Sequence, residues 1–377
     1  MKGLTAIAAM TALSAAAATA APPANVVAQA KARIAQIAHA SDAVGKPRSA
    51  PAWRRGENVW VIACDDGIGC QAPAHSLQEA GHLLGWKVTD FNGQANPAEY
   101  TKGVDEAIAD NADAIVLSSV DCRFIRAPLE RARQAGIVIV GWDSLDCSDP
   151  SGGGGEALLD YDMMRAFRGS PGLVGFIENW GRYKTDYVIA RTNGHAMVIV
   201  FSESDIASMV YQGDAIKAEL ARCHECKIVA DIEYTLPELF NQGLQKKFET
   251  ALAEHPEADA VVTLYDGAIL YAIAPVLQQV HRTNMLVAGG EGYPDSLDLI
   301  RAGKGQSCAF AVAVAESGYP IADELIRLFA HKPPVGEGIG LALIDNQHNL
   351  SRIQKFYDGF FPYAAYYTRL WHRAGER

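Results

Sequence analysis

The sequence has no surplus of basic residues: 33 Lys and Arg stand against 44 Asp and Glu in 377 residues, a formal net charge of −11. Because neutralising phosphates requires excess Lys and Arg, this balance argues against a nucleic-acid or anionic-membrane partner. The 34 Gly and 17 Pro are too few for a fibrous or wholly disordered chain. After residue 21 no stretch reaches about 18 apolar residues, so we expect no membrane-spanning helix there.

The sequence also lacks the short motifs that mark common enzyme sites. It contains no Gly-x-Ser-x-Gly elbow, no His-Glu-x-x-His, no dinucleotide fingerprint after a strand and no Walker loop. His195, His224 and His281 have no nucleophile or carboxylate at a telling spacing. The pair Asp65-Asp66 could serve acid–base chemistry, but ligand recognition is a less demanding explanation. We therefore predict a protein that is not an enzyme and needs no cofactor.

The first 21 residues have the pattern of a secretory signal peptide. Lys2 gives a positive start, residues 4–20 form an uncharged Ala-rich run, and residues 18–21 are the small residues typical of a cleavage site. The alternative, a membrane anchor, is disfavoured because about 17 weakly apolar residues make a poor span. No Cys follows the run as a lipid-attachment site. We therefore expect an exported protein of the periplasm, without membrane insertion.

Seven Cys in an exported chain suggest disulfide bonds. Neighbouring Cys would pair, and Cys308, in an apolar run, would remain as a small buried hydrophobe. The Cys-His-Glu-Cys at 223–226 could also be half a zinc site or a redox motif. However, no second ligand pair is visible, and the motif follows a helix rather than opening one. We predict no metal site and three disulfides: Cys64–Cys70, Cys122–Cys147 and Cys223–Cys226.

Short runs rich in β-branched residues alternate with amphipathic segments of helix length. After a predicted helix and Pro-marked linker at 22–53, runs occur at 58–63, 87–91, 113–117 and 137–141, with helices starting near Gln71, Pro97 and Phe124. The rhythm breaks at 144–175 and resumes at 195–201, 227–232, 259–264 and 285–289. These runs are apolar on both faces, as strands between helix layers must be. The pattern predicts an α/β fold of two doubly wound parallel-sheet domains.

Two features stand apart from this rhythm. The run Ser-Gly-Gly-Gly-Gly at 151–155 is interpreted as an exposed loop, since the Gly-Lys-Ser/Thr of a phosphate-binding loop does not follow it. After Cys308 the sequence predicts a strand, a helix at 316–330 and a strand at 339–344. The tail from 349 to 377 carries an aromatic cluster that should pack on a domain.

The order of these elements resembles the type I periplasmic binding proteins, especially the ribose-like sugar-binding branch. The resemblance covers roughly residues 54–346, and its most telling stretches are NPAEYTKGVDEAIADNADAIVLSSVD to QAGIVIVGWDS, EHPEADAVVTLYDGAILYAI and MLVAGGEGYPDSLDLIRAGKGQSCAFAV. Some repressors share this domain, but a repressor would need an N-terminal helix-turn-helix. The resemblance implies domain one at 54–145 and 316–330, domain two at 178–308 and 339–377, and a ligand cleft between them. Hinge crossings would lie at 144–178, 308–315 and 332–342.

Ligands of open parallel sheets bind beyond the carboxyl ends of the strands. The candidate ligand-binding residues at those positions are Asp66, Ser118, Asp121, Trp142, Asp143, Asn179, Trp180, Glu203, Tyr265, Asp266 and Glu291. Asp205 and Asp266 could instead be helix caps, and the two Trp could be hinge packing.

The resemblance gives several of these residues an expected role. Asp143 takes the place of an acid that binds ligand hydroxyls, and Ser118 that of a polar sugar contact. Tyr265-Asp266 stands where the family often has Asn-Asp, and Glu291 where it often has Asp. The family's Arg near positions 209–210 is absent, and Val312 replaces a polar residue.

The candidate loops carry eight acids against one nearby base, Arg123. Carboxylates accept hydrogen bonds only, and Trp and Tyr rings attract cations. We expect a sugar or polyol as ligand, with an amine or cationic compound as the close alternative. The resemblance implies a monomeric solute-binding protein that closes about a hinge and delivers its ligand to the permease of an ABC importer. The alternative is a ligand-sensing subunit that partners a histidine kinase or chemoreceptor.

Overall fold

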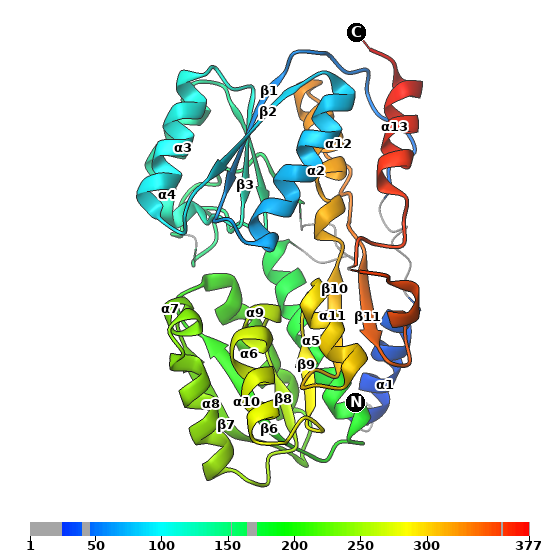
Figure 1. Cartoon of the computed structure of the whole chain (residues 1–377). Coiled ribbons are helices and arrows are strands. Elements are labelled where there is room, and N and C mark those ends of the chain that lie inside the picture. The colour runs from blue at the N-terminus through cyan, green and yellow to red at the C-terminus, as the bar shows by residue number, and fades with distance from the viewer. Residues whose placement is uncertain (1–24, 40–45, 152, 164–171, 356, 377) are drawn as a thin grey trace, which may run out of the picture.

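The computed structural model describes residues 25–39, 46–151, 153–163, 172–355 and 357–376; the predicted signal peptide lies outside them. It contains a five-stranded sheet of order β2-β1-β3-β4-β5 and a six-stranded sheet of order β11-β10-β9-β8-β6-β7. Figure 1 shows the two sheets with their helices stacked end to end. We call the part around the five-stranded sheet domain one and the part around the six-stranded sheet domain two. The predicted α/β class with two sheet domains is confirmed.

The strands of domain one are parallel, and its central strands β1, β3 and β4 are largely apolar and buried on both faces. In β1, Val59 and Val61 join the core under α2, whereas Trp60 and Ile62 join the core under α3 and α4. Alternate side chains of a strand point to opposite faces, so a strand between two helix layers must be apolar throughout. The bounds are β1 (Asn58–Ala63), α2 (Ile68–Leu84), β2 (Lys87–Asn92), α3 (Pro97–Ala109), β3 (Ala114–Ser118), α4 (Cys122–Gln134), β4 (Val138–Trp142), β5 (Tyr161–Asp162), η3 (Val314–Glu316), α12 (Gly318–Phe329) and α13 (Tyr363–Ala374).

Domain two repeats this construction and ends with one antiparallel strand, β11, beside β10. Its β6 also divides its apolar residues between two cores, with Val198 and Val200 on one face and Ile199 and Phe201 on the other. The bounds are α1 (Val26–Ala38), α5 (Leu173–Arg191), β6 (Ala196–Glu203), α6 (Ala207–Ala221), β7 (Cys226–Tyr234), α7 (Leu236–Phe240), α8 (Gly243–Glu254), β8 (Ala260–Val262), α9 (Asp266–Ala268), η2 (Ile269–Ile273), α10 (Ala274–Gln279), β9 (Leu286–Gly289), α11 (Pro294–Ala302), β10 (Cys308–Val312), β11 (Leu341–Asp345) and η4 (Leu350–Arg352).

The three expected disulfides are present, and Cys308 is a free, buried thiol. Cys64–Cys70 joins the end of β1 to α2, and Cys122–Cys147 joins the start of α4 to the loop after β4. Cys223–Cys226 closes the turn before β7. Two of the three bonds therefore hold the carboxyl end of the domain-one sheet.

The two ends of the described chain pack on opposite domains. Helix α1 lies against α5 and β11 of domain two, whereas α13 lies against α12 of domain one (Figure 1). In α13, Trp371 stacks on Tyr319 and donates a 2.7 Å hydrogen bond from its Nε1 to Asp323 Oδ1. The prediction that 339–377 belongs wholly to domain two is therefore wrong: β11 belongs there, but the aromatic face of α13 is buried on α12.

Because the ends cross over, more segments connect the domains than expected. Three connections pass from β5 to α5, from β10 to α12 and from α12 to β11, close to the predicted hinge. Two further connections pass from α1 to β1 and from β11 to α13. The predicted crossing at 308–315 also needs correction, because most of it is the strand β10. Across the described ranges, no helix has the length and apolarity needed to cross a membrane.

Candidate functional site between the two domains

The loops that follow the strands of the two sheets meet at the interface between the domains. Arg123, at the start of α4, donates from Nη2 to the Asp205 carbonyl after β6, at 3.0 Å. Tyr211 of α6 donates from its hydroxyl to Asp149 Oδ1, also at 3.0 Å. A Cβ added at Gly69 would lie 2.8 Å from the Tyr293 hydroxyl, so α2 of domain one and the Tyr293 side chain of domain two approach closely. The carboxyl ends of the sheets therefore face each other, as ligand-binding parallel sheets require.

Asp143 directly follows β4 at this interface. Its backbone is left-handed, with φ of 47°, which turns the chain out of the strand. Its Oδ2 accepts a 3.3 Å hydrogen bond from the Ser119 hydroxyl, but its buried Oδ1 has no hydrogen-bond partner. Burial, with added repulsion from Asp121 and Asp162, raises the pKa of Asp143 to about 7. Oδ1 of Asp143 is therefore an acceptor that is shielded from water and that a ligand hydroxyl could use.

Across the interface, Glu291 follows β9. Its Oε2 accepts a 3.3 Å hydrogen bond from the Asp266 amide. Burial is the main cause that raises the pKa of Glu291 to about 8; Asp266 and Asp143 raise it further, and Lys184 opposes the shift. The charges of Asp143 and Glu291 therefore act on each other across the two domains. Tyr293 shares this environment, since burial and Glu291 raise the pKa of its hydroxyl.

The chain is similar in fold to known periplasmic binding proteins. Residues 61–160 match the family model of the periplasmic binding protein domain. The solute-binding protein of an ABC transporter from Burkholderia graminis, solved with D-arabinose, has a TM-score of 0.63 and 17% identity, covering 80% of this chain and 99% of that one. An ABC transporter solute-binding protein from Actinobacillus succinogenes with bound D-allose has a TM-score of 0.65 and 13% identity, covering 79% and 100%. A periplasmic ribose ABC transporter structure from Conexibacter woesei has a TM-score of 0.65 and 15% identity, covering 80% and 95%.

The chain has the type I periplasmic binding protein fold. The expected resemblance to sugar-binding members is confirmed at the level of the fold. A comparison with curated protein sequences finds no match. Several of the candidate ligand-binding residues make hydrogen bonds within their own domain, as described next.

In domain one, two candidate residues are engaged within the domain. Ser118 is fully buried, and its hydroxyl donates to the Cys70 carbonyl at 2.8 Å. Asp121 Oδ1 accepts from the Leu145 amide at 2.9 Å, and Oδ2 lies 3.8 Å from Arg123 Nε. Burial raises the pKa of Asp121 despite these contacts. Asp66 is exposed in the loop between β1 and α2.

The two candidate Trp lie in the core. Trp142 is 3% exposed and Trp180 is 6% exposed. Trp180 donates from Nε1 to the Phe310 carbonyl at 2.9 Å, which ties α5 to β10. Asn179, beside it on α5, accepts a short hydrogen bond from Arg182. Trp180 therefore holds α5 to the domain-two sheet.

Asp266 holds together the loops at the carboxyl end of the domain-two sheet. Its Oδ2 accepts from the amides of Gly292 and Tyr293 at 2.8 and 2.9 Å. Its Oδ1 accepts from the Ser296 hydroxyl at 2.5 Å and from Gln306 Nε2 at 3.4 Å. The carboxylate is fully buried and accepts at both oxygens, so it braces the start of α11.

Sequence reasoning missed Lys184, a fully buried cation on α5. Its Nζ donates to Gln212 Oε1 at 2.7 Å and to the Leu264 carbonyl, and lies 3.9 Å from the centre of the Trp180 ring. Burial lowers its pKa to about 7, against the opposing effect of Glu291 and Asp266. Lys184 follows Trp180 by one helical turn, so the two side chains lie on the same face of α5. This spacing is the sequence signal that could have identified Lys184 as buried beside the ring.

Glu203, Tyr234 and Tyr265 form a separate group at the same end of domain two. Glu203 ends β6, Tyr234 ends β7 and Tyr265 follows β8, and these three strands are neighbours in the sheet.

Within the described residues, the acid and thiol groups close enough to share a metal ion are Cys64, Asp65 and Cys70, but both Cys are in a disulfide.

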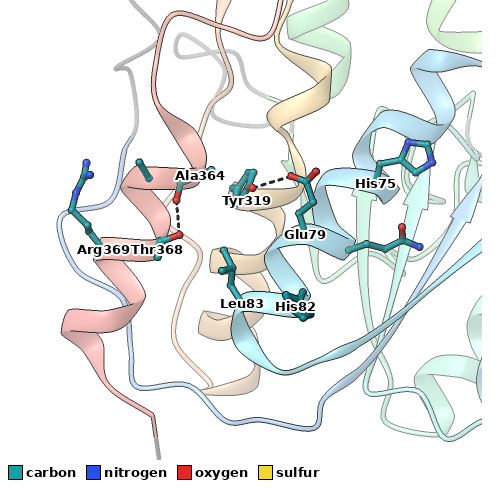
Figure 2. Close-up of a pocket in the computed structure, with 10 residues that line it drawn as sticks. His75, Glu79, His82, Leu83, Tyr319, Ala364, Thr368 and Arg369 are labelled. Carbon is teal, nitrogen blue, oxygen red and sulfur yellow. Dashed lines mark hydrogen bonds between the residues drawn. The ribbon is translucent and has the colours of Figure 1, made fainter.

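A groove of about 930 Å³ lies between α2, α12 and α13 of domain one. Figure 2 shows His75, Glu79 and His82 following one another along α2, with Thr368 and Arg369 on α13 at the other side of the groove. At its floor the Tyr319 hydroxyl donates to Glu79 Oε2 at 3.0 Å. The groove is distinct from the interdomain site.

Proposed function

We propose that this protein is a periplasmic solute-binding protein that captures a sugar or polyol between its two domains and delivers it to an ABC importer. The observation that carries the proposal is Asp143, which has a buried Oδ1 without a partner and follows β4 at the interface where strand-end loops of both domains meet. The sugars bound in the structures from Burkholderia graminis and Actinobacillus succinogenes support the ligand class.

The mechanism is hinge closure. A ligand hydroxyl donates to Asp143 on domain one, and further groups on the ligand contact domain two, so the ligand binds the closed form more tightly. Closure removes water from the site, which strengthens a hydrogen bond to a carboxylate. An importer then distinguishes the closed, loaded form from the open one.

The test is a thermal-shift screen of pentoses, hexoses and polyols on the exported protein, followed by calorimetric titration. A ligand at 100 times its Kd stabilises the folded state by about 2.7 kcal/mol. Asp143→Asn is expected to weaken binding by roughly ten- to a hundred-fold, since it replaces a charge-assisted hydrogen bond worth about 1.5–3 kcal/mol. The control Asp298→Asn, at an exposed position on α11, should leave the affinity unchanged. If no member of the screen stabilises the protein, the proposal is wrong.

A further inference from the structure

A buried cation contacts the loop after β8 in domain two. Lys184 of α5 is fully buried. Its Nζ donates to Gln212 Oε1 and to the Leu264 carbonyl, and it lies 3.9 Å from the centre of the Trp180 ring. All of these partners are uncharged, and among the described residues no carboxylate lies within salt-bridge distance of Lys184. A buried ammonium group without an ionic partner destabilises the fold unless charges farther away compensate it.

The loop after β8 links Lys184 to Glu291, the acid that follows β9 at the interdomain site. The Leu264 carbonyl, which accepts from Lys184, lies two residues before Asp266. The Asp266 amide in turn donates to Glu291 Oε2 at 3.3 Å. Residues 264–266 therefore contact both the buried cation and the acid.

The other titratable groups that face Lys184 or Glu291 come from both domains and are Asp143, Asp266, Tyr293 and Cys308. Burial and the two Asp raise the pKa of Glu291, whereas Lys184 lowers it. Burial lowers the pKa of Lys184, and Glu291 and Asp266 oppose that shift. The charge of Lys184 and the charge of Glu291 therefore stabilise each other.

We infer that Lys184 is a positioning residue for ligand binding: its buried charge keeps Glu291 ionised, so that Glu291 accepts a hydrogen bond from a ligand hydroxyl on the domain-two side of the interface. This inference rests on the proposed function. A carboxylate accepts at both oxygens, whereas a protonated acid also donates, so the charge of Glu291 decides which ligand groups it can bind. Opposite charges interact strongly where water is excluded, so removal of Lys184 should disfavour the ionised form of Glu291.

The first test measures the ionisation of Glu291 without ligand. NMR of protein with carbon-13 in its Glu carboxyl groups follows each Glu through a pH titration, and Glu291→Gln identifies the Glu291 signal by its loss. In Lys184→Met the midpoint of Glu291 is expected to rise by about one pH unit or more, because a nearby opposite charge shifts a buried acid by that order. The control Lys217→Met removes a partly exposed Lys of α6 and should leave the midpoint unchanged.

The second test titrates D-allose and D-arabinose by calorimetry at neutral and alkaline pH. At neutral pH Lys184→Met is expected to bind roughly ten-fold more weakly than the wild type, because a one-unit rise in the midpoint lowers the ionised fraction of Glu291 by about that factor. At alkaline pH Glu291 ionises in the variant as well, so the affinities should converge. In a Glu291→Gln background, Lys184→Met should not change the pH dependence of binding.

Each other outcome has a defined meaning. If the midpoint of Glu291 does not move in Lys184→Met, or if the affinity falls equally at every pH, Lys184 is merely structural: the inference is wrong and the proposed function stands. If neither these sugars nor any member of the wider screen binds, the proposed function fails and the inference fails with it. Should Lys184→Met not fold, Lys184→Gln removes the charge and keeps a donor for the Leu264 carbonyl; it is expected to raise the midpoint in the same way, and an unchanged midpoint would overturn the inference.

Discussion

At the carboxyl end of the domain-one sheet two disulfides hold the loops, whereas at the corresponding end of domain two a buried carboxylate, Asp266, holds them through hydrogen bonds alone. In domain one, Ser118 donates to the Cys70 carbonyl and the Val120 amide donates to Ser144 Oγ. In domain two, Glu203, Tyr234 and Tyr265 interact with one another at the ends of neighbouring strands. The disulfide of domain two lies at the opposite end of its sheet, before β7.

The difference indicates unequal roles in ligand binding. Loops held by covalent bonds and satisfied hydrogen bonds lose little entropy on binding, so domain one offers a preformed surface. The loops of domain two have no such covalent bond at this end of the sheet and depend on Asp266. Asp143, whose buried Oδ1 has no partner, and Asp266, which accepts from four donors, can each be used to test the comparison.

Asp266→Ala is expected to have the largest effect on stability. The substitution removes the acceptor of four donors at a fully buried position, and each unsatisfied buried donor costs about 1–3 kcal/mol. We expect the free energy of unfolding to fall by about 3–5 kcal/mol in urea denaturation. Asp298→Ala, an exposed acid on α11, is the control and should change it by less than about 0.5 kcal/mol. A loss below about 1 kcal/mol for Asp266→Ala would show that these loops do not depend on it.

Removal of the Cys122–Cys147 bond should affect domain one selectively. The bond spans 25 residues, and a closed loop of this length stabilises a fold by about 3 kcal/mol. Cys122→Ser with Cys147→Ser should therefore lower stability by about that amount and increase amide hydrogen exchange in the loops after β3 and β4. The matched control removes Cys223–Cys226, which spans 3 residues and should cost less. Equal exchange increases in both domains would contradict a locally preformed surface.

The buried acid Glu203 should make the protein less stable as pH rises. Burial raises the pKa of Glu203 from 4.5 to about 7, so between these values the folded state binds more protons than the unfolded state. The free energy of unfolding then falls as pH rises through this window, by roughly 2 kcal/mol between pH 5 and pH 7. Glu203→Gln should remove that part of the pH dependence in urea denaturation, and Glu233→Gln should not.

Other buried groups also bear on this measurement, and among them burial raises the pKa of Glu316 to about 7. Asp143 and Glu291 also have raised pKa values, about 7 and about 8, so part of the pH dependence should persist in Glu203→Gln. Lys184, with its pKa lowered to about 7, adds stability only as pH rises above 7, which is outside the window. An unchanged slope in Glu203→Gln would mean that this acid is ionised and satisfied in the folded protein.

The sequence predicted what depends on local pattern. Apolar runs such as residues 58–63 became strands, because a strand buried on both faces must be apolar throughout. The disulfides followed from neighbouring Cys in an exported chain. The docking of α13 on domain one was not predictable in this way, because an amphipathic face does not specify which partner surface will cover it. Position at a strand end also could not distinguish Asp266, which is saturated by internal donors, from Asp143, whose buried Oδ1 has no partner.

The smallest expected effect comes from two adjacent serines. Ser118 donates to the Cys70 carbonyl inside domain one, whereas Ser119 donates to Asp143 Oδ2 at the interface. Ser118→Ala should cost about 1 kcal/mol of stability, the value of one hydrogen bond, and change sugar affinity less than about two-fold. Ser119→Ala frees the Asp143 carboxylate to rotate and should weaken binding by several-fold with less effect on stability. Urea denaturation measures the stability of both variants, and calorimetric titration measures their sugar affinity. If Ser118→Ala weakens binding as much as Ser119→Ala, Ser118 contacts the ligand and the domain-one surface is not preformed.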